Sequence, residues 1–176
     1  MIQTELKELL LAETSRANTD FVGNIVKKKP ELIHDLWEIY FRKEEPISRR
    51  AAWIIDTVSE NHPEWVAPYI PALIDLLPTF NHDGLKRHGL RMLERSIIPD
   101  DRQGDLMNIC FEWLLSKEEA VAAKMYCMLI LHSLSSQVPE IRHELIDTIE
   151  FQMAEGTPGF ISIGRKILKQ LYAATK

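Results

Sequence analysis

Apolar residues recur at steps of three and four along most of the chain. The pattern is clear in residues 32–40 and 106–114, where polar residues fill the positions between. This spacing gathers apolar side chains on one face of a helix and predicts ten amphipathic helices. Prolines punctuate the runs where each could occupy the first turn of a helix; these are Pro30, Pro46, Pro63, Pro99, Pro139 and Pro158.

The apolar pattern itself repeats every 37 residues. One column of the repeat holds Ile33, Ile70 and Met107, and it continues at Ile146 after a short insertion. Each repeat contains two helices, and a cation recurs near the start of the second; these cations are Arg50, Arg87, Lys124 and Arg165. A fixed period of this length is typical of an α-solenoid, in which each helical hairpin covers the apolar face of its neighbour.

With these columns and this recurrent cation, the chain resembles the HEAT and armadillo-like repeat family over roughly residues 30–172. The resemblance implies an all-α fold, a right-handed α–α superhelix of about five helix pairs. We expect one domain over residues 1–176. Its expected parts are a capping pair, 1–29, and four repeats, 30–62, 63–98, 99–138 and 139–176.

The resemblance also implies a ladder of hydrogen bonds between repeats, in which an acidic residue precedes each recurrent cation. The implied pairs are Glu45 with Arg50, Asp83 with Arg87, and Glu119 with Lys124, whereas the copy at Arg165 has no acid in the equivalent loop.

The second repeat is predicted to be the least regular. Pro68 and Pro71 should delay or kink its first helix, and Pro78 should end that helix. Trp65 and Tyr69 lie four residues apart at its start. They form either an exposed contact edge or a staple against the preceding hairpin.

Charge separates by helix set, although the net charge of the whole chain is only −5. Acidic residues concentrate in the first helices of the pairs, and the second helices carry an excess of Lys and Arg. In the family that the chain resembles, second helices usually line the concave face, so a cationic inner surface is implied. Arg87, Arg91 and Arg95 form a stripe on a helical wheel opposite the apolar side, and we expect this stripe to face solvent.

We therefore predict a non-enzymatic interaction module that binds an acidic segment of another protein on a basic concave face, because Arg offers paired donors to carboxylates. The predicted partner-binding residues are Arg49, Arg87, Arg91, Arg95, Arg165 and Lys169. Two simpler interpretations stay open: Arg87 could serve the ladder, and Arg91 could pair with Glu94 on its own helix.

An alternative function is suggested by a HEAT-like branch of alkylpurine DNA glycosylases, which handle damaged DNA with tryptophan and aspartate in a basic groove. Trp53 and Asp56 lie three residues apart on a second helix and could hold a base and stabilise a developing cation. The competing interpretation makes Trp53 a core residue and Asp56 a surface acid. The net charge of −5 also disfavours strong binding to nucleic acid in general.

Other chemistry has little support in the sequence. The six histidines include no pair four residues apart on one helix, and the seven glycines form no phosphate-binding loop, so we expect neither a metal nor a cofactor. The longest apolar run is 125–131, far below the ~20 residues of a membrane span. No secretory signal is visible, and two cysteines in apolar contexts suit a buried, reduced state, so we expect a cytoplasmic protein.

Overall fold

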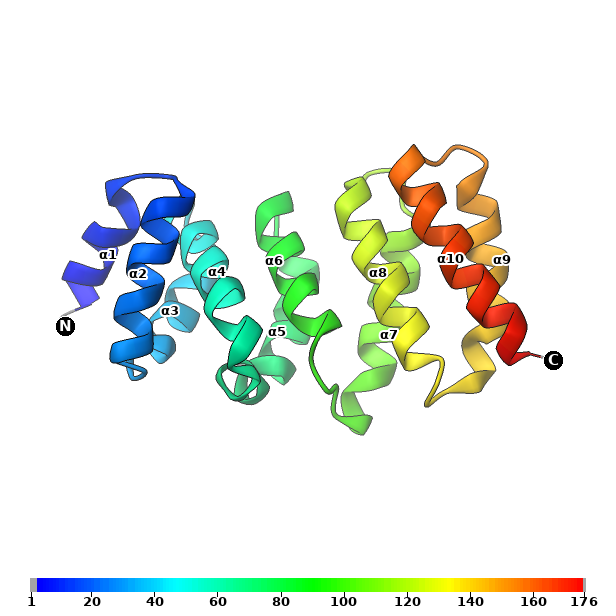
Figure 1. Cartoon of the computed structure of the whole chain (residues 1–176), viewed down its shortest axis with the longest axis horizontal. Helices are drawn as coiled ribbons and strands as arrows, with labels where there is room; N and C mark the ends of the chain where they lie inside the picture. The colour runs from blue at the N-terminus through cyan, green and yellow to red at the C-terminus, as the bar shows by residue number, and fades with distance from the viewer. Residues whose placement is uncertain (1–2, 176) are drawn as a thin grey trace. The chain divides into compact units, whose positions relative to one another are not determined.

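The computed structural model describes residues 3–175, and that range contains ten α-helices and no β-strand (Figure 1). The predicted number of helices is thereby confirmed. Their bounds are α1 Gln3–Ala12, α2 Arg16–Lys28, α3 Leu32–Phe41, α4 Ile47–Val58, α5 Ile70–Leu76, α6 Asp83–Glu94, α7 Asp100–Leu115, α8 Val121–Leu134, α9 Arg142–Met153 and α10 Pro158–Ala174.

The helices gather into two compact units, the first ending at Ile97 and the second beginning at Ile98. In the first unit, α4 packs between α2 and α6 and against α3. In the second unit, α8 packs against α7 and α10, and α9 packs against α10. Within each unit the second helices of successive pairs are therefore neighbours. A single domain over the whole chain stays a prediction.

The core of the first unit is built around two aromatic side chains of α3. Trp37 and Tyr40 are both fully buried, as the predicted apolar columns require. The indole of Trp37 donates a hydrogen bond to the carbonyl of Trp65 at 2.9 Å, and the hydroxyl of Tyr40 donates to the carbonyl of Leu85 at 2.8 Å. Because a buried polar group costs stability unless it is paired, these bonds also fix how α3 meets the next repeat.

The second repeat is irregular, as its prolines predict. Its first helix is divided into short 3₁₀ turns at Pro63–Trp65, Ala67–Tyr69 and Leu77–Thr79, which flank the seven residues of α5. Tyr69 stacks on Trp37 with ring centroids 4.7 Å apart, and Trp65 stacks on His62 at 4.0 Å. The interpretation as a staple against the preceding hairpin therefore fits Tyr69, whereas the ring of Trp65 packs on the nearby His62.

The core of the second unit contains both cysteines, Cys110 on α7 and Cys127 on α8. Neither side chain is exposed, which confirms their predicted burial. Burial raises the pKa of the Cys110 thiol well above its ordinary value, and the neighbouring Cys127 raises it further. Such a thiol stays protonated and unreactive.

Candidate functional site: paired and unpaired cations

Two of the four recurrent cations, Arg50 and Lys124, connect neighbouring repeats, but through different partners from those implied by the family resemblance. Arg50 donates a hydrogen bond from Nη1 to the carbonyl of Leu10 on α1 at 2.8 Å. Lys124 donates from Nζ to Oε1 of Gln152 on α9 at 3.3 Å. Both contacts cross from one helical pair to the next, so these cations still join repeats.

Two of the implied ladder pairs are wrong. Glu45 pairs with Arg49 one turn further along α4, at 3.1 Å, and not with Arg50. Asp83 and Arg87 are both exposed and make no ion pair with each other within residues 3–175. The spacing of four residues favours the pair of Glu45 with Arg49 over one with Arg50, whereas nothing in the structure explains why Asp83 and Arg87, at the same spacing, do not pair.

The prediction that the stripe of Arg87, Arg91 and Arg95 faces solvent is wrong for two of its three members. Arg91 and Arg95 turn onto α4, where Arg91 Nη1 lies 3.0 Å and Arg95 Nη1 lies 2.6 Å from the carboxylate of Asp56. Arg91 also reaches Glu60 at 2.6 Å. Only Arg87, nearest the start of α6, remains exposed.

Asp56 is the centre of this cluster, and its side chain is fully buried. Its Oδ2 accepts hydrogen bonds from Nδ1 of His88 at 2.8 Å and from Arg91, and its Oδ1 accepts from Arg95. Burial alone would raise the pKa of the Asp56 carboxyl, but the hydrogen bonds and charges of His88 and Arg95 lower it by more. The net pKa lies below its ordinary value, so Asp56 is held ionised.

This geometry does not favour a base-handling role for Trp53 and Asp56. Trp53 is half-buried and lies over the ring of His88, with centroids 6.5 Å apart and an interplanar angle of 20°. Both oxygens of Asp56 are occupied by donors of the chain itself, which leaves no face of the carboxylate for a nucleotide. The interpretation of Asp56 as a surface acid is wrong, because its carboxylate is buried and connects α4 to α6 through hydrogen bonds.

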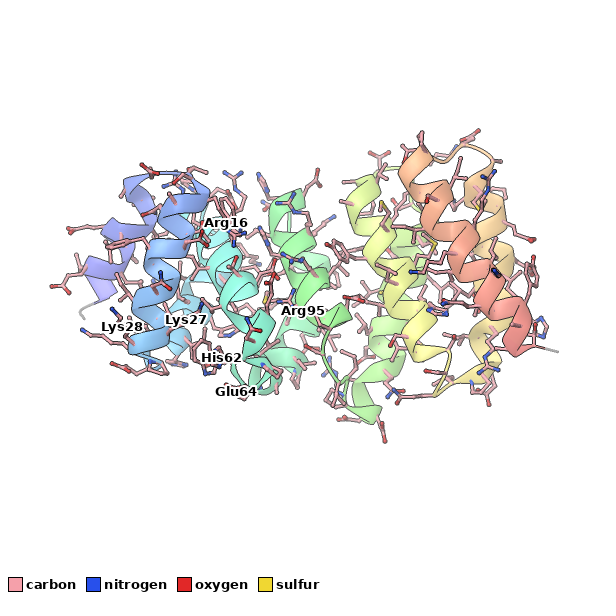
Figure 2. The ribbon with its side chains drawn as sticks, viewed as in Figure 1. Arg16, Lys27, Lys28, His62, Glu64 and Arg95 are labelled. Carbon is pink, nitrogen blue, oxygen red and sulfur yellow. The ribbon has the colours of Figure 1, made fainter. Side chains whose placement is uncertain are left out.

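Sequence reasoning missed His88 and Glu60 as parts of this cluster. A signal was present in the sequence. Asp56 on α4 and Glu60 in the 3₁₀ turn Ser59–Asn61 that follows it lie four residues apart. Arg91 on α6 and Arg95, the C-cap of α6, have the same spacing, so complementary charges recur at the ends of consecutive second helices. Figure 2 shows Arg95 at the C-terminal end of α6, on the side that faces α4.

The predicted cations of the last helix are placed differently. Arg165 and Lys169 of α10 are exposed, as is the neighbouring Lys166, and none of the three makes an ion pair within the described chain. No acidic residue occurs on α10. These three side chains, named the α10 cations below, therefore keep their charge available to solvent.

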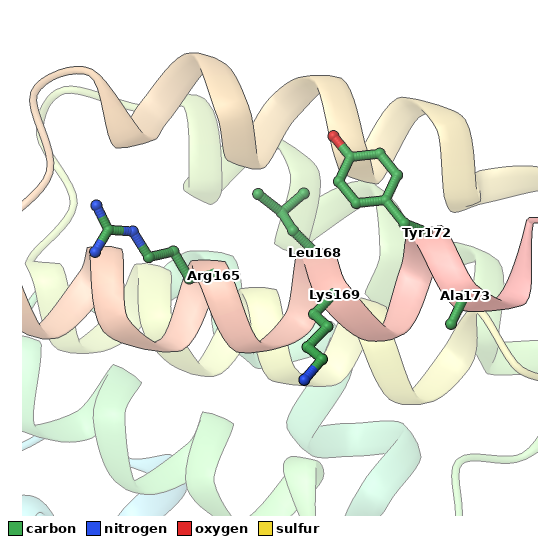
Figure 3. A pocket seen from close by; sticks show the side chains of 5 residues that line it. All are labelled: Arg165, Leu168, Lys169, Tyr172 and Ala173. Carbon is green, nitrogen blue, oxygen red and sulfur yellow. The ribbon is translucent and has the colours of Figure 1, made fainter.

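A shallow open hollow of about 560 Å³ lies along this helix, lined by Arg165, Leu168, Lys169, Tyr172 and Ala173 (Figure 3). The ring of Tyr172 leans toward α9, where its hydroxyl donates a hydrogen bond to Glu150, and Lys169 extends to the other side of α10. The hydrogen bond to Glu150 raises the pKa of the Tyr172 phenol and holds its ring as one wall of the hollow. The surface combines two cations with apolar side chains.

Metal chemistry and membrane spanning find no support in the described part of the chain. No group of three or more His, Cys, Asp or Glu side chains there is arranged to hold a metal ion. No helix between residues 3 and 175 combines the length and the apolar character that a bilayer span requires.

The family model for the HEAT repeat domain matches residues 6–171. The protein therefore belongs to the HEAT repeat family and is an all-α solenoid, in agreement with its ten helices. Proteins with such repeats commonly mediate protein interactions. Comparisons with curated proteins and with solved structures gave no significant match.

Proposed function

We propose that this protein is a non-enzymatic interaction module that binds an acidic segment of a partner protein through the α10 cations. The observation that carries the proposal is a contrast among the predicted binding residues. Arg49, Arg91 and Arg95 are paired with carboxylates of their own chain. Arg87, Arg165 and Lys169 are exposed and make no ion pair within residues 3–175, and of these Arg165 and Lys169 share one helix that carries no acidic residue.

An acidic peptide fits this surface better than a nucleic acid does. Three cations on one helix can meet a few carboxylates, and Arg165 offers the planar pair of donors that a carboxylate accepts. A duplex would require neutralisation of many phosphates by a chain whose net charge is −5. Leu168 and the ring of Tyr172 add apolar contact area beside the charges.

The test is a titration of fluorescent poly-glutamate, measured by anisotropy at low and at moderate salt. Arg165→Glu combined with Lys169→Glu should weaken binding by about tenfold or more, which corresponds to about 1.4 kcal/mol. The matched control is Lys27→Glu combined with Lys28→Glu, which reverses two exposed cations of α2 and so makes the same change in net charge.

The control variant should bind nearly as well as wild type, because its charge change lies in the first unit. Equal losses in both variants would show a response to net charge alone and would overturn the proposal. An oligonucleotide that bound more tightly than poly-glutamate, and lost binding with Arg165→Glu and Lys169→Glu, would assign the same surface to nucleic acid instead.

A further inference from the structure

The second unit contains a groove between the tips of two hairpins. It has a volume of about 600 Å³ and is formed where the end of α7 and the start of α8 face the end of α9 and the start of α10. The residues that line it include Leu115, Lys117, Val121, Phe151, Glu155 and Phe160. This volume is that of a site for a small ligand or a few side chains.

Exposed apolar side chains concentrate at this groove. Phe151 is 74% exposed, Leu115 48% and Val121 41%, and all three belong to the small set of large hydrophobic side chains that the described chain leaves in solvent. Phe160, which is buried, completes the wall from α10. Scattered apolar residues on a surface need no explanation, but several around one hollow mark an interaction site.

Both lysine and glutamate side chains lie at the rim of the groove. Lys117 and Lys124 lie on the side of α8, and Lys124 is held in place by its hydrogen bond to Gln152. Glu150 and Glu155 lie on the side of α9, and Glu150 is engaged by the hydroxyl of Tyr172. Lys117 and Glu155 are exposed and make no ion pair within residues 3–175, so each can meet an opposite charge on a ligand.

We propose that this groove binds a short amphipathic segment of a partner protein, with large apolar side chains against Phe151, an acidic residue toward Lys117 and a basic residue toward Glu155. Lys117 and Glu155 lie on opposite sides of the groove, so their charges favour one orientation of the bound segment over the reverse. A second copy of this chain fits less well, because a stable dimer buries about 800 Å² on each partner and a groove of this size accepts only a few side chains. The site is distinct from the α10 cations and goes beyond the proposed function.

The test is selection of a displayed random-peptide library on the full chain, followed by affinity measurements on the selected peptides. Enriched sequences should carry an apolar centre flanked by an acidic residue on one side and a basic residue on the other. Phe151→Ala should weaken them by about tenfold or more, as is typical of a buried aromatic anchor. The matched control is Phe21→Ala, which truncates an exposed phenylalanine of α2 and should change affinity little.

A charge swap tests the favoured orientation separately. Lys117→Glu combined with Glu155→Lys should prefer peptides in which the acidic and basic residues are exchanged. A library that yields no peptide, or peptides insensitive to Phe151→Ala, overturns the groove proposal. Purely acidic peptides that bind wild type and Phe151→Ala alike, but not the double variant of Arg165 and Lys169, overturn it while they support the proposed function.

Self-association is the remaining outcome. Dimerisation of wild type in sedimentation experiments that disappears in Phe151→Ala would replace the peptide with a second copy of the chain, and the proposed occupant would be wrong.

Discussion

The guanidinium of Arg95 lies 2.6 Å from the fully buried carboxylate of Asp56, and it also donates to the Asp56 carbonyl at 2.7 Å. The residue that caps the C-terminus of α6 therefore binds both the side chain and the backbone of a residue on α4. Arg95, His88 and Arg91 all bind the carboxylate of Asp56, and these bonds connect two consecutive repeats. The cations that looked most like a binding surface instead help to hold the first unit together.

Neutralisation of the buried carboxylate should be strongly destabilising. Asp56→Asn keeps the shape of the side chain but leaves His88 and Arg95 without their anionic partner. Removal of one member of a buried ion pair costs about 3–5 kcal/mol of unfolding free energy. Urea unfolding followed by circular dichroism measures this loss.

The control for this variant is Glu60→Gln, which removes the other carboxylate that Arg91 contacts. Because Glu60 is 45% exposed, solvent screens its ion pair, and the expected loss is about 1 kcal/mol or less. Similar losses in the two variants would contradict a special role for the buried carboxylate.

The contribution of Asp56 should disappear in acid. Its pKa is lowered in the folded protein, so folding favours the ionised form, and the associated stability is present above the ordinary carboxyl pKa. That stability is lost as the pH falls through the lower pKa of the folded state. The groups that face this carboxylate are His88, Arg91 and Arg95.

The difference in unfolding free energy between wild type and Asp56→Asn should accordingly shrink as the pH falls below about 4. Urea unfolding of both proteins at a series of pH values measures it. A difference that grows as the pH falls below about 4 would have the wrong sign for a carboxylate with a lowered pKa.

Gly89 should resist even the smallest substitution. A Cβ atom at this position would lie 2.7 Å from the hydroxyl of Tyr40 and 3.3 Å from methyl groups of Leu73 and Leu77, all within the core. Gly89→Ala should therefore cost about 1–3 kcal/mol through overpacking, although alanine favours a helix. Thermal and urea unfolding provide the measurement.

Gly104 is the matched control because it also lies within a helix, α7, but a Cβ atom there would meet nothing within 4 Å. Gly104→Ala should increase stability by about 0.5–1 kcal/mol. The same sign of change at both positions would contradict the close approach of α6 to Tyr40.

The cysteines should react only when the second unit opens. Both thiols are buried, and burial raises the pKa of Cys110, so little thiolate forms at neutral pH. A thiol-specific disulfide reagent should label two cysteines rapidly in denaturant and slowly in the native protein. Rapid labelling of the native protein would show that α7 and α8 do not pack as described.

The sequence predicts the helices, the irregular second repeat and the burial of Trp37 because these features follow from local periodicity and proline chemistry. It also predicts Arg165 and Lys169 as exposed cations, since no acid on α10 competes for them. It does not predict the fate of Arg91 and Arg95. A helical wheel shows which side chains lie opposite the apolar face of their helix. The contacts that those side chains make depend on how α6 packs against α4, which the wheel does not show.

Amide NMR spectra of the full chain, titrated with a short poly-glutamate peptide, show whether α10 carries the recognition surface. We expect chemical-shift changes concentrated along residues 165–173, with Lys27 and Lys28 of α2 unaffected at the same peptide concentration. Changes centred on α2 or α6, or none near Arg165 and Lys169, would contradict it.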